Sequence, residues 1–203
     1  MSCKESIENL LQETKRPGMQ SLLYWMDQNG FYDAPCSSKY HLAKPGGLAE
    51  HSLNVFRIAI SILPDLVKDQ SKISFSLVDS VVICSLLHDL GKAGQFGKRN
   101  YISIAKHEKP FAKDSSNDKF NDFKNVSIEY ETNKDLLYVP HEIRSVVIAS
   151  KFIDLTEEEQ FAILYHNGLY GELKGFKGQE TPLYLILSYA DLWAARITEQ
   201  EDK

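Results

Sequence analysis

The chain of 203 residues has few cysteines, Cys3, Cys36 and Cys84, and they lie far apart. No CxxC or CxxH spacing occurs, so they predict neither a disulfide framework nor a cysteine-ligated zinc site. Such thiols fit a reducing compartment, and we expect a cytoplasmic location. The chain is long enough to bury a core without disulfides or a structural metal, so any bound metal should serve chemistry.

Long apolar runs and an excess of positive charge are also missing. The longest apolar stretches, such as residues 81–87, are far shorter than the roughly 20 residues that span a bilayer, and the N-terminus lacks the apolar run of a signal peptide. A net charge of -5 disfavours a grip on duplex DNA. We therefore expect neither a membrane nor duplex DNA as a partner, and the oligomeric state stays open.

The charge is unevenly distributed along the chain. Residues 92–124 contain eight Lys and Arg against four Asp and Glu, a local +4 that leaves -9 for the remainder. A basic segment can attract a small phosphate-bearing ligand, although a solvated loop explains the same composition. The acidic remainder would repel a long polyanion.

Apolar residues recur at helical spacing through most of the sequence. We expect helices near residues 7–11 and 19–26, from 48 to Pro64, from 74 to 90 with Gly91 as the terminating residue, from Pro140, after a Thr156–Glu159 capping box, and after Thr181–Pro182. Between 92 and 139 the helical period is lost, and alternating segments at 101–104 and 126–130 predict a small β-hairpin. The predicted fold is one all-α domain over 1–203 with an irregular, hairpin-containing insertion at about 92–139.

Ligand-type residues lie on the apolar faces of the predicted helices. The inward-facing set comprises His51, His88, His141, His166 and Asp191, and Asp89 follows His88 at a helix end. One inward histidine is more often a hydrogen-bonded core residue, and His141 as a helix cap with His166 in the core remains an alternative. A buried carboxylate such as Asp191 is harder to explain without a cation, because burying its charge alone costs several kcal/mol. Mixed imidazole and carboxylate donors favour one or two divalent transition ions, Mn, Fe, Ni, Co or Zn, over Mg.

Two short motifs carry a resemblance to a known family. Residues 46–51 read GGLAEH, residues 88–92 read HDLGK, and a distant Asp191 follows. This ordered set, within about residues 40–195, resembles the HD-domain metal-dependent phosphohydrolase superfamily. The resemblance implies an all-α bundle of five or more helices and metal ligation by His51, His88, Asp89 and Asp191.

Further residues suggest a place within that superfamily. Members with two metals add histidines between the HD pair and the last aspartate, and His141 and His166 occupy such places. The HHExxDGxGYP run of the cyclic-dinucleotide phosphodiesterase branch is missing. Residues 40–47, with His41, resemble a segment of the HD-type 3′-to-5′ exoribonucleases in which the histidine faces the substrate.

These residues predict a metal-dependent phosphohydrolase acting on a nucleotide or short oligonucleotide. A divalent ion can lower the pKa of bound water from ~15.7 toward ~7 and offset phosphate charge. Asp89 would bridge metals or orient water. Lys92 would contact phosphate or be solvated, and His41 would protonate the leaving oxygen, bind phosphate, or be an ordinary loop residue. A 3′-to-5′ exoribonuclease-like enzyme, a non-catalytic metal-stabilised regulatory or binding module, and an oxygenase remain as alternatives.

Overall fold

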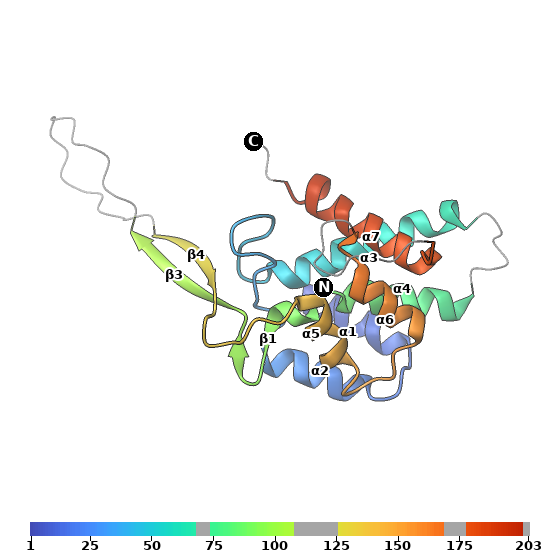
Figure 1. Cartoon of the computed structure of the whole chain (residues 1–203), viewed down its shortest axis with the longest axis horizontal. Helices are drawn as coiled ribbons and strands as arrows, with labels where there is room; N and C mark the ends of the chain where they lie inside the picture. Colours follow the sequence, from blue (N-terminus) through green and yellow to red (C-terminus); the bar gives the residue numbers. More distant parts are fainter. Residues whose placement is uncertain (68–73, 108–125, 169–177, 201–203) are drawn as a thin grey trace, which may run out of the picture.

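The computed structural model describes residues 1–67, 74–107, 126–168 and 178–200 (Figure 1). In this part of the chain, helices predominate and two small antiparallel hairpins accompany them. The α-helices are α1 (Cys3–Glu13), α2 (Met19–Gln28), α3 (Gly47–Leu66), α4 (Phe75–Leu87), α5 (His141–Ala149), α6 (Glu157–Tyr165) and α7 (Pro182–Trp193). The expectation of a mainly helical protein is confirmed.

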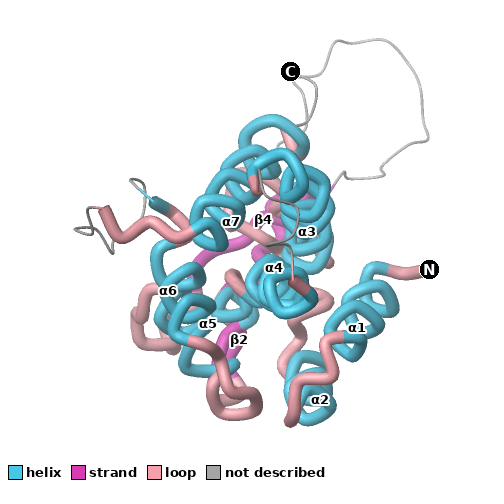
Figure 2. Tube along the Cα trace, turned by 90° about the vertical axis from the view of Figure 1, so that its right-hand side faces the viewer, coloured by secondary structure: helices cyan, strands magenta, loops and turns pink. Residues whose placement is uncertain are grey.

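The helices pack around a core of leucine, isoleucine and other apolar side chains. Helix α3 contacts α4 and α7, and α6 packs against both α5 and α7. Figure 2 shows α1 and α2 beside each other on one side of the molecule, with α5 and α6 on the opposite side. No α-helix in the described ranges combines the length and apolar composition needed to cross a bilayer.

Capping side chains begin several helices as their sequence predicts. The Thr156 hydroxyl accepts from the backbone N–H of Glu159, and the Glu159 carboxylate accepts from the backbone N–H of Thr156. Thr181 caps α7 by accepting from Tyr184, with Pro182 in the first turn. These bonds satisfy amide groups that have no partner within the helix.

Two predicted helix ends were wrong. Helix α3 continues past Pro64 to Leu66, because a proline this close to the C-terminus removes only one late helical hydrogen bond. Helix α4 ends at Leu87 instead of continuing to residue 90, and a 3-10 turn, η2 (Leu90–Ala93), follows. Gly91 lies inside η2 and is needed for space: a Cβ there would lie 2.4 Å from the carbonyl oxygen of His141.

The predicted hairpin in the insertion is confirmed. Strand β3 (Tyr101–His107) pairs antiparallel with β4 (Val126–Thr132), and a smaller hairpin, β1 (Gly94–Gln95) with β2 (Lys98–Arg99), precedes it. The β3–β4 hairpin projects away from the helices (Figure 1). Residues 108–125, which hold much of the predicted basic segment, lie outside the described residues.

Candidate metal centre

The six residues predicted as metal ligands come together from five helical segments. Helix α3 supplies His51, the end of α4 supplies His88 and Asp89, α5 begins with His141, α6 ends at His166, and α7 supplies Asp191. The side chains of His141 and Asp191 keep exposures of 27% and 15%, whereas the other four are buried. The helical bundle therefore brings imidazole nitrogens and carboxylates into one largely dry cluster.

One group of donor atoms surrounds His51 Nε2. This nitrogen lies 3.3 Å from His88 Nε2, 3.6 Å from Asp89 Oδ2 and 3.1 Å from Asp191 Oδ1. His88 Nε2 lies 3.5 Å from Asp89 Oδ2 and 3.9 Å from Asp191 Oδ1. Donor atoms that share an ion at about 2.1 Å lie about 3.0 to 3.4 Å apart, so the spacing is close to that of a common metal shell.

A second group surrounds the other oxygen of Asp89. Oδ1 lies 3.1 Å from His141 Nε2 and 3.6 Å from His166 Nε2. Asp89 therefore presents one oxygen to each group of histidines. This arrangement is suited to a carboxylate shared between two neighbouring ions.

Asp89 Oδ1 is buried without a hydrogen-bond donor in the described part of the chain. An unsatisfied carboxylate oxygen in the interior is costly, so a native structure rarely retains one without a reason. The imidazole nitrogens nearest to this oxygen are Nε2 of His141 and Nε2 of His166. The Nδ1 atoms of the same two rings lie beside oxygen acceptors. The donor set thus fits a divalent cation better than it fits an internal hydrogen-bond network.

Three of the four histidine rings make a hydrogen bond through Nδ1 to an oxygen atom, and Nδ1 of the fourth, His141, lies near a carboxylate. His51 Nδ1 lies 3.0 Å from both carboxylate oxygens of Glu199, and His141 Nδ1 lies 3.3 Å from Glu142 Oε2. His88 and His166 each use Nδ1 toward the carbonyl three residues earlier in the helix, Ser85 at 3.0 Å and Ile163 at 2.7 Å. When Nδ1 carries the proton, the Nε2 lone pair is directed into the cluster, as metal ligation requires.

Charge and burial act together on the ionisation of the cluster. Burial alone would raise the pKa of Asp89, but the charges of Lys92 and His88 lower it well below its usual range. Burial lowers the pKa of His166 to about 3, and the charge of His88 adds to this effect. Both residues are thus in their metal-binding forms, carboxylate and neutral imidazole, at neutral pH.

Lys92 is part of the cluster, since its Nζ lies 2.6 Å from Asp89 Oδ2 and its side chain is only 15% exposed. The fully solvated lysine considered from the sequence is therefore wrong. The ammonium offsets one carboxylate charge.

His41 lies beside the cluster, on the loop between α2 and α3. Its Nε2 is 3.3 Å from Cys36 Sγ and 3.9 Å from Glu199 Oε2. Burial lowers the pKa of His41, and the positive charges of His51 and Lys92 lower it further. The ring is thus neutral at pH 7 and can donate one N–H to a ligand.

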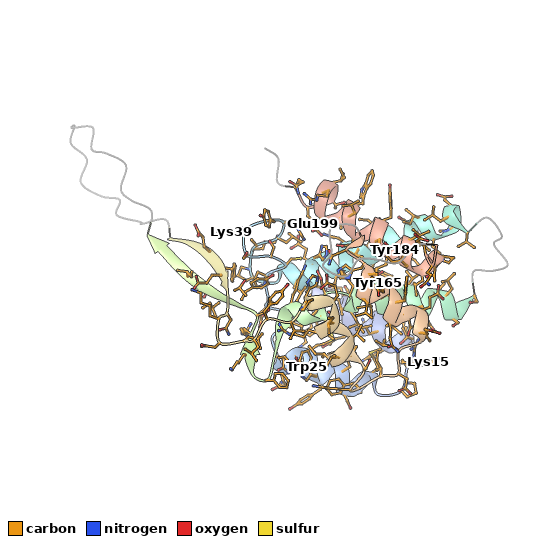
Figure 3. The ribbon with its side chains drawn as sticks, in the orientation of Figure 1. Lys15, Trp25, Lys39, Tyr165, Tyr184 and Glu199 are labelled. Carbon is orange, nitrogen blue, oxygen red and sulfur yellow. The ribbon has the colours of Figure 1, made fainter. Side chains whose placement is uncertain are left out.

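Sequence reasoning missed the residues that orient the histidines. Glu199 follows the π-helix η4 (Ala194–Thr198), near the C-terminal end of the described chain (Figure 3). Its Oε1 also accepts from Asn54 Nδ2 at 3.0 Å. Glu142 accepts from Asn167 Nδ2 at 2.7 Å. The His141–Glu142 dipeptide was the one visible signal, because a carboxylate beside a ligating histidine often fixes its tautomer. No comparable signal marked Glu199, which lies 148 residues from its partner His51.

Comparisons with protein-family models, curated proteins and solved structures found no match for this chain.

Proposed function

We propose that this protein is a metal-dependent phosphohydrolase of the HD-domain superfamily, which its GGLAEH and HDLGK motifs resemble, and that it acts on a nucleotide or short oligonucleotide. One observation carries the proposal. Asp89 presents Oδ2 to His51 and His88, and Oδ1 to His141 and His166. This pattern suits a carboxylate that would bridge two sets of imidazole donors.

The residues divide between two metal positions. His51, His88 and Asp191 with Asp89 would hold one divalent ion, and His141 and His166 with the other oxygen of Asp89 would hold a second. Nitrogen and oxygen donors suit Mn, Fe, Ni, Co or Zn, with Mg less well matched. Such ions supply a bound water of lowered pKa and positive charge opposite the phosphate oxygens.

The chain's own residues position the substrate and the metal ligands. Glu199 holds the ring of His51, and Glu142 holds the ring of His141, so that their Nε2 atoms stay directed at the cluster. Lys92 would bind a phosphate oxygen with its ammonium at the partly exposed edge of the site. His41, being neutral, would donate an N–H to the phosphate or to the leaving oxygen.

The charge distribution supports a small substrate. The chain carries a net charge of -5, and four carboxylates, those of Asp89, Glu142, Asp191 and Glu199, surround the cluster. Divalent ions would offset this local negative charge and leave the site attractive to a phosphate group. A long polyanion would meet repulsion elsewhere on the acidic surface.

A phosphate-release screen tests the proposal. Metal-free protein is incubated with nucleoside mono-, di- and triphosphates and dinucleotides in Mn, Co, Ni, Zn or Mg, beside an Asp191→Asn variant. We expect release with at least one substrate class in a transition ion and none in the variant. Metal binding without hydrolysis of any of these would favour the non-catalytic binding module instead.

A further inference from the structure

A second kind of donor set lies next to the proposed hydrolytic centre. Cys36, His41 and His51 offer donor atoms that all lie within 4.8 Å of one another. Cys36 Sγ is buried and lies 3.3 Å from His41 Nε2. This set shares His51 with the proposed hydrolytic centre but differs from it in chemistry, because that centre has no sulfur among its ligands.

The loop between α2 and α3 holds Cys36 and His41 together. The backbone N–H of Cys36 donates to the carbonyl of Leu42 at 3.1 Å, and the Ser37 hydroxyl donates to the carbonyl of His41 at 2.9 Å. The start of α3 closes on this loop, because a Cβ on Gly47 would lie 2.0 Å from the carbonyl oxygen of Leu42. These contacts hold the backbones of Cys36 and His41 close together in one loop.

The spacing is close to what a thiophilic ion requires. With Zn–S at about 2.3 Å and Zn–N at about 2.1 Å, sulfur and nitrogen ligands of one tetrahedral ion lie about 3.6 Å apart. Cys36 Sγ and His41 Nε2 are already near this distance, and the His51 donor atom, within 4.8 Å of both, needs a shift of at most about 1.4 Å. The His41 side chain is 18% exposed, so one donor residue of the set is accessible to an ion from solvent.

We propose that Cys36, His41 and His51 form an inhibitory site for thiophilic divalent ions such as Zn²⁺ or Cd²⁺. Binding forms a metal–sulfur bond, and the Cys36 thiol proton leaves to solvent. A neutral imidazole has a single lone pair, so His51 cannot serve this ion and the hydrolytic centre together, whichever ring nitrogen it uses. A thiolate favours Zn²⁺ or Cd²⁺ over Mn²⁺, and a soft ion therefore removes a ligand from the hydrolytic ion.

Cadmium titration tests the site without relying on the proposed function. The full chain is used in a Cys3→Ser background, because Cys3 is an exposed thiol. Ultraviolet absorption reports the thiolate-to-cadmium charge-transfer band as Cd²⁺ is added to metal-free protein. We expect a saturable band that Cys36→Ser abolishes, while Cys84→Ser, the matched buried-thiol control, retains it.

The imidazole ligand gives a second variant that stays informative if Cys36→Ser fails to fold. His41→Ala should weaken Cd²⁺ binding about tenfold or more, read from the same band. If phosphate release is found in Mn²⁺, Cd²⁺ should inhibit the protein with Cys36 intact at a concentration about tenfold lower than it inhibits the Cys36→Ser variant. The variant resists because its His51 remains available to the hydrolytic ion. The cadmium site is overturned if no band forms, or if the band is unchanged in Cys36→Ser or in His41→Ala. If the band forms as expected but no substrate is hydrolysed, the metal site stands and only the proposed function is contradicted.

Discussion

Asp89 carries two kinds of interaction at once. Its Oδ2 is ion-paired with Lys92 at 2.6 Å, and its buried Oδ1 faces two imidazole nitrogens. The ion pair stabilises the folded chain, whereas the imidazole side is where the structure favours a cation. Substitutions can therefore separate the contribution of this carboxylate to stability from its contribution to chemistry.

Asp89→Asn should abolish phosphate release while leaving the circular dichroism spectrum close to that of the wild type, because asparagine fills the same volume without the charge. The metal-free variant should lose roughly 2 to 3 kcal/mol of unfolding free energy, less than for a fully buried pair because Lys92 retains some exposure. Urea unfolding measures this loss.

The double variant Asp89→Asn with Lys92→Met is the matched control. It should recover most of the stability, since no unpaired ammonium remains, but none of the activity. A double variant as unstable as the single one would contradict the ion pair. Activity within a few fold of wild type in either variant would remove Asp89 from the reaction.

Close contact between η2 and α5 sets the position of the His88–Asp89 pair relative to His141. Gly91 in η2 packs against the first turn of α5, and its backbone N–H donates to the Ser145 hydroxyl at 2.8 Å. His141 begins α5, so the distance between His88 and His141 depends on this contact. The requirement at Gly91 is space, since its φ is not in the left-handed region.

Gly91→Ala should lower stability by about 1 to 3 kcal/mol, because the new Cβ would overlap the His141 carbonyl and force α5 outward. It should also weaken metal binding at the His141 side. Gly97→Ala is the control: its φ of +73° gives backbone strain of about 1 kcal/mol, but nothing lies within 4 Å of the added Cβ. Isothermal titration with Mn²⁺ compares the two, and equal metal affinity in both variants would contradict the role of the contact.

Glu159 ties α6 to α4 and to the segment between α1 and α2 through its buried carboxylate. Arg16 donates two hydrogen bonds to it, at 2.8 and 3.0 Å, and the Ser80 hydroxyl of α4 donates a third at 2.8 Å. Burial alone would raise the pKa of Glu159, but these bonds and the one from the Thr156 backbone lower it below its usual 4.5. The protein thus gains stability from the ionised form, in full above about pH 5, and loses it as the pH falls through the lowered pKa.

Glu159→Gln should cost about 2 to 4 kcal/mol at pH 7, since Arg16 loses its counter-charge. It should also flatten the fall in stability below about pH 5 that the wild type shows. Urea unfolding at several pH values checks both effects. The control Glu158→Gln, at an exposed position in the same helical turn, should change the unfolding free energy little. If stability depends on pH equally in the wild type and in Glu159→Gln, the pH dependence does not come from Glu159.

The sequence predicted those features that local pattern determines. Helical periodicity placed the seven helices and turned His51, His88 and Asp191 inward, because burial of an apolar stripe controls each helix separately. The Thr156–Glu159 capping box was predicted as a local motif, but its bond with Arg16 was not, since residues 143 positions apart meet only after folding. For the same reason Glu199, which orients His51, and Cys36, which approaches His41, could not be found from spacing.

At the scale of the whole molecule, the acidic charge of the chain predicts a preference for short substrates. Mononucleotides and dinucleotides should be hydrolysed faster than a single strand of about 20 nucleotides, and added salt should narrow the difference by screening the repulsion. Steady-state rates at two ionic strengths measure this. Faster cleavage of the long strand, with stepwise shortening from one end, would instead favour the exoribonuclease-like activity.

If Asp89 joins two metal positions, the number of ions bound per chain should follow the number of positions left intact. Metal-free protein is equilibrated with Mn²⁺, freed of unbound ion and examined by elemental analysis. The wild type and a His107→Ala control should bind about two ions. The double variant His141→Ala with His166→Ala and the single variant His88→Ala should each bind about one, because each removes ligands of one position only. No bound ion in the wild type, or the same single ion in the wild type and the double variant, would contradict the account.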